Sequence, residues 1–364
     1  MPKRVLYWHR SDLRLHDNEC LVRACSDDQE VLPVYVYDER HYRILDLGFR
    51  KTSHLRYKYL QDTLINLREN YRKIGGNILI GYGKPEEILP KLVADYQCHE
   101  LIYQQEIMSE ETEVESQLKE EINAQSCQLT PVWGRTLYHL DDLPYELSTI
   151  PITSKAFRIN TSKATEPRAL FSTPERIRFV ALKDYGDVDQ SAKIGFSDEE
   201  LATDYDAEAF PAGETAALER LGHYTFDSEL LTNYKWTRNK SLGLDYSNKF
   251  SPYLAHGSFA PTNLPHGERI RRRDKKEHID LVAGLRGSLA GLFQFSRDAI
   301  RRYGFLFRGL QAGKDRMERG LRLVRPVEKR HDGYSVRGCP PAPTEPHGFH
   351  EQPGPSEHVE LSGP

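Results

Sequence analysis

Two clusters of polar and charged residues have types and spacings that could do chemistry. The first runs from Trp8 to Asn18 and holds two arginines, two aspartates, an asparagine and a tryptophan within eleven residues. It follows a short apolar run, which is where an α/β domain places a ligand-facing loop. The alternative is a loop that pairs its own charges and binds no ligand, and composition alone favours that structural role.

The second cluster lies between Tyr234 and Ala255. Its polar residues next to a proline are Ser247, Asn248, Lys249 and Ser251. Their hydroxyls, amide and cation, together with backbone N–H groups where a helix starts, would suit a phosphate. The alternative is an ordinary helix start capped by Ser251, with Pro252 at the first helical position. Spacing alone slightly favours this alternative.

The elements that must position these clusters can be read from the first 140 residues. Short β-branched or aromatic runs alternate there with longer amphipathic stretches, which indicates βα units. Strands are predicted at 5–8, 31–37, 77–80, 100–103 and 129–132, and helices at 21–25, 51–71, 85–96 and 110–124. The pattern predicts a doubly wound, five-stranded parallel sheet with helices on both faces. GxGxxG and GxxxxGK[ST] are absent, so dinucleotide-binding and P-loop proteins find no support.

The rest of the chain changes character twice. Periodicity is lost near residue 143 and prolines become frequent, and helical patterning resumes after about residue 208. We therefore expect an α/β domain at 1–142, an interdomain linker at 143–207, an incomplete helical domain at 208–314 and an irregular tail at 315–364. A transmembrane span is excluded, because no run of eighteen apolar residues occurs.

Taken together, the motifs resemble the photolyase/cryptochrome family. They are WxRxDLRxxDN near the N-terminus, then GExAALxRL, YxxxRN and YSxKFSPYLAxG about two hundred residues later. The phrasing TRNxxLGxDYSNKFSPYLAHGS is most similar to the DASH branch, and the resemblance runs from about residue 4 to Pro261. It implies a photolyase-type sheet domain followed by an FAD-type helical domain.

The resemblance also implies a function. Family members hold FAD, absorb blue light and can pass an electron to a pyrimidine dimer in DNA. This chain would then be a blue-light photoreceptor or a light-driven DNA repair protein, a deoxyribodipyrimidine photolyase-like lyase, with single-stranded or damaged DNA as partner. The sheet domain would hold an antenna pigment, for which the folate 5,10-methenyltetrahydrofolate is a candidate.

Site residues follow from the resemblance one position at a time. The flavin contacts would be Tyr234 and the phosphate-binding loop Ser247, Asn248, Lys249, Phe250 and Ser251. Arg238 would contact a DNA phosphate, with a structural ion pair as an equal alternative. Glu106 and Glu110 would lie at the antenna, although surface glutamates at a helix start explain them as well. No catalytic residue and no metal ligand can be assigned.

The segment after Pro261 departs from the family pattern. The net charge is −10 up to Pro261 and +6 beyond it, and the three tryptophans are Trp8, Trp133 and Trp236. The last 34 residues hold seven prolines and five glycines, a composition that does not build a packed core. Translation of an out-of-frame or mispredicted coding stretch would explain this segment, and a natural basic tail is the competing explanation. Either way, we expect impaired flavin chemistry.

Two further expectations concern setting and class. The N-terminus lacks an apolar signal region, and the five cysteines are scattered without a CxxC pair. These features predict a reduced protein of the cytoplasm, nucleus or an organelle that is not secreted, and we expect a monomer. The alternative function is a nucleotide- or partner-binding α/β module without photochemistry.

Overall fold

The computed structural model describes residues 2–25, 29–228, 230–240 and 243–263. The chain divides into two compact units, 1–313 and 314–364, and every described residue belongs to the first. The predicted tail, and the predicted helical domain beyond Asn263, lie outside the described residues.

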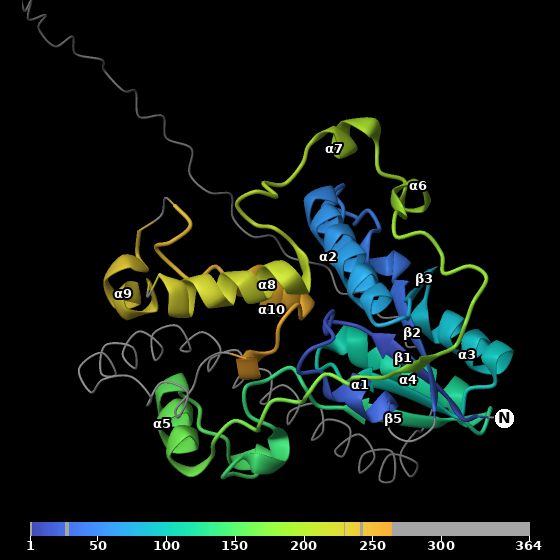
Figure 1. Cartoon of the computed structure of the whole chain (residues 1–364), viewed down its shortest axis with the longest axis horizontal. Coiled ribbons are helices and arrows are strands. Elements are labelled where there is room, and N and C mark those ends of the chain that lie inside the picture. The colour runs from blue at the N-terminus through green and yellow to red at the C-terminus, as the bar shows by residue number, and fades with distance from the viewer. Residues whose placement is uncertain (1, 26–28, 229, 241–242, 264–364) are drawn as a thin grey trace, which may run out of the picture. The chain divides into compact units, whose positions relative to one another are not determined.

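The predicted five-stranded parallel sheet is confirmed (Figure 1). Its strands are β1 (Arg4–His9), β2 (Glu30–Tyr37), β3 (Leu79–Tyr82), β4 (Glu100–Gln104) and β5 (Gln128–Val132), in the spatial order β3-β2-β1-β4-β5. All neighbouring pairs are parallel, and central β1 places Tyr7 opposite Pro33 of β2 and Ile102 of β4. A two-residue strand, β6 (Arg178–Phe179), also pairs with β2. The chain order thus reverses beside β1, where doubly wound sheets bind ligands.

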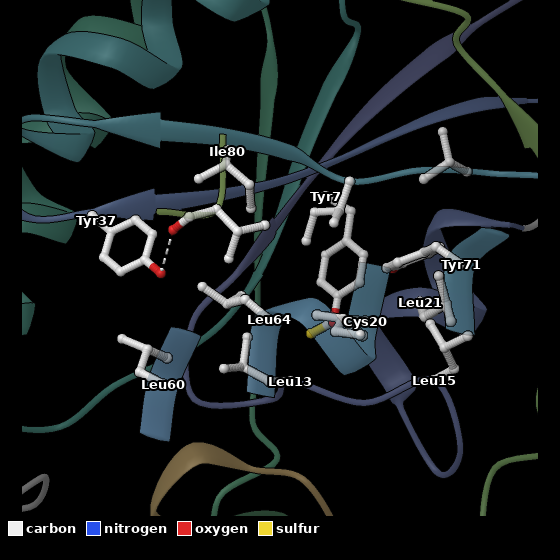
Figure 2. Close-up of a cluster of buried hydrophobic side chains, with 14 of the residues drawn as sticks. Tyr7, Leu13, Leu15, Cys20, Leu21, Tyr37, Leu60, Leu64, Tyr71 and Ile80 are labelled. Atoms are coloured by element: carbon white, nitrogen blue, oxygen red, sulfur yellow. Dashed lines mark hydrogen bonds between the residues drawn. The ribbon is translucent and has the colours of Figure 1, made fainter. Parts of the chain in front are cut away.

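Helices cover both faces of the sheet because successive β1 side chains point in opposite directions. Val5 and Tyr7 face α1 (Glu19–Ala24) and α2 (His54–Lys73), and Figure 2 shows Tyr7 among Leu21, Leu64 and Tyr71 on that side. Leu6 and Trp8 lie in a second cluster with side chains of α3 (Pro85–Tyr96) and α4 (Ser109–Asn123). These boundaries lie within three residues of the predicted ones.

The segment expected as a linker carries more regular structure than its sequence indicated. After the 3-10 turn η2 (Leu140–Asp142), which ends just before it, this segment contains the 3-10 turn η3 (Leu147–Thr149), α5 (Ser154–Ala164), β6, α6 (Ser191–Ile194) and α7 (Asp198–Ala202). In α5, the Thr153 side chain caps the helix start, and only Phe157 and Thr161 are buried. A helix with so few buried positions leaves no clear apolar periodicity in the sequence.

The helical segment packs around a core that it shares with side chains from residues 107–157. It consists of α8 (Gly213–Gly222), the π-helical turn η4 (His223–Asp227), α9 (Leu230–Thr237), α10 (Ser251–His256) and η5 (Pro261–Asn263). Five large side chains are buried together in this core, which is separate from the two clusters of the sheet: Phe157, Leu221, Tyr224, Phe250 and Phe259. None of the helices in the described ranges is long and apolar enough to cross a membrane.

Candidate functional site

The loop Trp8–Asn18 leaves the carboxyl end of β1, as predicted, and pairs its own polar groups. The Asp12 carboxylate accepts from the Tyr7 hydroxyl at 2.6 Å and from the Arg10 amide at 2.8 Å. The Asn18 side-chain amide donates to the Tyr7 hydroxyl at 2.7 Å, and its oxygen caps α1 at the Leu21 amide. Burial alone would raise the pKa of Asp12, but the hydrogen bond and charge of His9, with these donors, hold it below its usual value. The structural interpretation of this loop therefore accounts for its aspartate and asparagine.

Replacing Tyr7 with phenylalanine tests that network. Both Asp12 and Asn18 would lose a buried partner in Tyr7→Phe, so we expect a loss of about 1–3 kcal/mol in the free energy of unfolding. Tyr59→Phe is the matched control, because the buried Tyr59 hydroxyl has no hydrogen-bond partner among the residues that the structure describes. Urea denaturation measures the free energy of unfolding of both variants. Equal losses would show that the hydrogen bonds of the Tyr7 hydroxyl do not stabilise the fold.

The same loop also fastens the sheet domain to the helical segment. The Leu13 amide donates to the His256 carbonyl at 3.2 Å, and Arg14 Nη1 donates to the Gly257 carbonyl at 3.0 Å. The Glu214 carboxylate at the start of α8 accepts from the amides of Leu15 and His16, both at 2.9 Å. We call these contacts the interdomain clasp. The clasp fixes the start of α8 and the end of α10 relative to the sheet.

A cavity of about 350 Å³ opens beside the carboxyl ends of β1 and β2. It brings together both antenna candidates, Glu106 and Glu110. Glu106 is buried, rather than on the surface, and is ion-paired with Arg135. Glu110 is exposed, and its hydrogen bond to Lys51 lowers its pKa below the usual range. Both carboxylates therefore already have cationic partners.

Sequence reasoning missed the residues that form one wall of this cavity. The Arg10 guanidinium lies 4.5 Å from the centre of the Trp8 ring and is ion-paired with Glu115 of α4. Burial raises the pKa of Glu115, and Arg10 opposes that rise. Trp8 and Arg10 alternate along the motif quoted above, which was the available signal, whereas nothing in the sequence connects Arg10 with Glu115.

The predicted flavin residues lie around one core. Tyr234 of α9 packs against the cluster that contains Tyr224 and Phe250, whose ring centres lie 5.9 Å apart. Tyr234 and the 247–251 loop are thus parts of one packed unit. Neither the cavity described above nor its lining includes any of these residues.

The predicted helix start at this loop is wrong by one residue. The helix α10 begins at Ser251, its N-cap is Phe250, and no side chain caps it. Phe250 already has right-handed helical backbone angles, φ −78° and ψ −13°, so Ser251 lies inside the helix and cannot act as N-cap. The Asn248 side chain instead accepts from the Phe250 amide at 3.3 Å.

Arg238 follows α9 on the surface. Its amide donates to the Tyr234 carbonyl at 3.0 Å, and its side chain is exposed. Among the described residues no ion pair of Arg238 occurs, so the structural alternative gains no support.

A residue that the sequence did not single out organises the loop. Arg220 of α8 donates to the carbonyls of Leu244, Ser247 and Asn248 and to the carboxylate of Asp245. The motif GExAALxRL contains this arginine, but its spacing alone does not reveal what it binds.

The chain matches known proteins in sequence and in fold. A DNA photolyase family model matches residues 5–174. Cryptochrome DASH (chloroplastic/mitochondrial) of Arabidopsis thaliana is 36% identical over 280 residues, covering 75% of this chain and 48% of that protein. Cryptochrome DASH of Gloeobacter violaceus is 36% identical over 256 residues, covering 70% of this chain and 51% of that protein.

Solved structures agree with these matches. The crystal structure of a Synechocystis sp. cryptochrome superposes with a TM-score of 0.69 at 30% identity, covering 82% of this chain and 62% of that one. A bacterial class III photolyase from Agrobacterium tumefaciens, at 19% identity and a TM-score of 0.65, shares the fold. The architecture is thus that of the photolyase type. The chain belongs to the photolyase/cryptochrome family, and it spans about half the length of the curated relatives it matches.

Proposed function

We propose that this chain is a DASH-type member of the family, an FAD-binding blue-light photoreceptor or light-driven pyrimidine-dimer repair protein, and that its flavin site is impaired as written. The observation that carries the proposal is the loop 247–251, which packs against the same core as Tyr234. When bound, FAD would supply light absorption and an electron. The chain's own residues would hold the cofactor, with Arg238 placed on the surface for a DNA phosphate.

The loop fits the diphosphate part of FAD. Among the described residues, no acceptor pairs with the backbone amides of Lys249 and Ser251. Lys249 has a left-handed φ of 56° and Phe250 follows in the right-handed region. Alternating backbone of this kind turns successive N–H groups toward one concavity that suits an anion. The ammonium of Lys249 adds a cation to the same loop.

The sequence offers fewer residues to enclose the isoalloxazine ring than to bind the diphosphate. In the family, the tryptophan-rich region that encloses the ring follows the segment matched here, and no tryptophan occurs after Trp236. Each neutral hydrogen bond to the diphosphate nets about 0.5–1.5 kcal/mol. Binding a large ligand costs at least about 4 kcal/mol of translational and rotational freedom. We therefore expect weak FAD retention.

Light-driven repair tests the impairment. We expect the purified chain to leave pyrimidine dimers in an oligonucleotide unchanged under blue light, because a chain that retains little FAD has little cofactor to absorb light and supply an electron. The matched control is a version in which the reading frame after the codon for Pro261 is restored, and there we expect repair in light but not in darkness. Light-dependent repair by the chain as written would contradict the proposal.

The second candidate function is a nucleotide- or partner-binding α/β module without photochemistry. The cavity of about 350 Å³ favours it, because cationic and acidic side chains line this cavity together. A folate antenna at Glu106 and Glu110 would occupy the same cavity. Mass spectrometry of small molecules released on denaturation separates the two, since a pterin supports the antenna and a nucleotide supports the module.

A further inference from the structure

Arg220 makes four polar contacts with the segment just before α10. Its Nη2 donates to the Leu244 carbonyl at 2.8 Å and to the Ser247 carbonyl at 3.1 Å. Its Nε donates to the Asn248 carbonyl at 3.1 Å, and its Nη1 to the Asp245 carboxylate at 2.9 Å. One guanidinium thus holds one side of residues 244–248.

The guanidinium is itself held in place. Its central carbon lies 5.1 Å from the centre of the Tyr224 ring, and that ring is fully buried. The π-helical turn that follows α8 carries Tyr224, and Tyr224 meets Phe250 edge to face. The side chain of Arg220 is 15% exposed. Arg220 is therefore fixed before any ligand arrives.

These contacts leave the opposite side of the loop available. Carbonyls that face Arg220 are satisfied, whereas the amide of Lys249 has no acceptor within the described part of the chain. A loop held in its bound shape loses less conformational entropy when it binds. We propose that Arg220 is a positioning residue that preforms the diphosphate-binding loop, with the pyrophosphate of a nucleotide as the ligand class. The inference rests on the proposed flavin site.

A lysine should not replace Arg220. Its ammonium is a single point with three donors, whereas the planar guanidinium spans acceptors on three carbonyls and one carboxylate. Arg68 offers a matched control, because it also holds carbonyls, those of Ile78, Tyr185 and Gly186, but in the sheet domain.

Hydrogen–deuterium exchange of the whole chain without ligand tests the positioning role. In Arg220→Lys we expect the peptide 244–251 to exchange at least about tenfold faster at its hydrogen-bonded Phe250 amide, because the Asn248 side chain that accepts from this amide lies in the segment that Arg220 no longer holds. Exchange in the β1 and α2 peptides should stay unchanged, which shows that the variant is folded. Arg68→Lys should speed exchange near Gly186 and leave 244–251 unaltered. Unchanged exchange of 244–251 in Arg220→Lys would overturn the inference.

Titration with ADP separates this inference from the proposed function. We expect ADP to bind the unaltered chain and Arg68→Lys equally, and Arg220→Lys about tenfold more weakly. If ADP binds none of them while loop exchange rises in Arg220→Lys, then Arg220 orders the loop but the loop is not a diphosphate site. That outcome rejects the flavin site and the ligand class together. Equal ADP affinity of all three chains would reject the positioning role for binding.

Discussion

Gly257→Ala is expected to be among the most damaging single substitutions in the described residues. Gly257 has a φ of +69°, and an added Cβ would lie 1.9 Å from the Ser11 carbonyl oxygen. The atom in the way belongs to the backbone of the loop Trp8–Asn18, and a backbone atom cannot move aside by changing a side-chain rotamer. Relief would require the loop to separate from α10, breaking the bond between Arg14 and the Gly257 carbonyl. We expect a loss of about 3–5 kcal/mol in the free energy of unfolding.

Gly195→Ala is the matched control for that prediction. Its φ of +74° is nearly the same, but an added Cβ would meet nothing within 4 Å. Only backbone strain then remains, worth about 1 kcal/mol. Thermal and urea denaturation of both variants would distinguish steric contact from strain. Equal losses would show that the approach of Gly257 to Ser11 does not hold the two segments together.

Removing the Glu214 carboxylate is expected to have a comparable effect. The buried side chain accepts from the amides of Leu15 and His16 and pairs with the His16 ring, and its other oxygen accepts from Asn70 at 2.8 Å. Glu214→Ala would leave these donors without an acceptor. Leaving several buried donors without their carboxylate costs about 3–5 kcal/mol. Glu30→Ala is the control, since the half-exposed pair of Glu30 with Arg4 should contribute at most about 1 kcal/mol.

The pH dependence of Glu214 has a definite sign. Burial would raise its pKa, but the hydrogen bond and charge of His16, with the two backbone amides, lower it below the ordinary value of 4.5. A carboxyl whose pKa is lower in the folded state stabilises the fold above its ordinary pKa and loses that contribution as pH falls through the folded value. The stability gap between the unaltered chain and Glu214→Gln should therefore be full at neutral pH and shrink below about pH 4.5. A gap that is constant with pH would contradict this assignment.

The sheet domain could be predicted because its signals are local. Strand β1 alternates buried side chains toward two helical layers, and α3 starts at Pro85 and ends at Tyr96 as its pattern indicated. The helix α5 escaped prediction because Phe157 and Thr161 are its only buried residues. The prediction that Ser251 is the N-cap was wrong because the backbone becomes helical one residue earlier, at Phe250. No residue type in this segment indicates that earlier start.

The candidate site was predictable only in part, because its decisive contacts join distant segments. The motif Trp8–Asn18 drew attention by its composition, yet its partners Glu214 and Gly257 lie about two hundred residues away. The role of Arg220 depends on how the 244–248 loop folds back over α8. Spacing indicated which residues matter, but the fold determines what they contact.

Flavin occupancy of the purified chain tests the central claim most directly. The claim is that residues up to Asn263 provide a preformed phosphate loop, whereas the ring pocket expected from the family is not encoded by the remaining sequence. The flavin absorption of the protein, and the FAD released on denaturation, give moles of FAD per mole of chain. We expect occupancy far below one for the chain as written and near one when the downstream frame is restored. Occupancy near one in the chain as written would contradict the account.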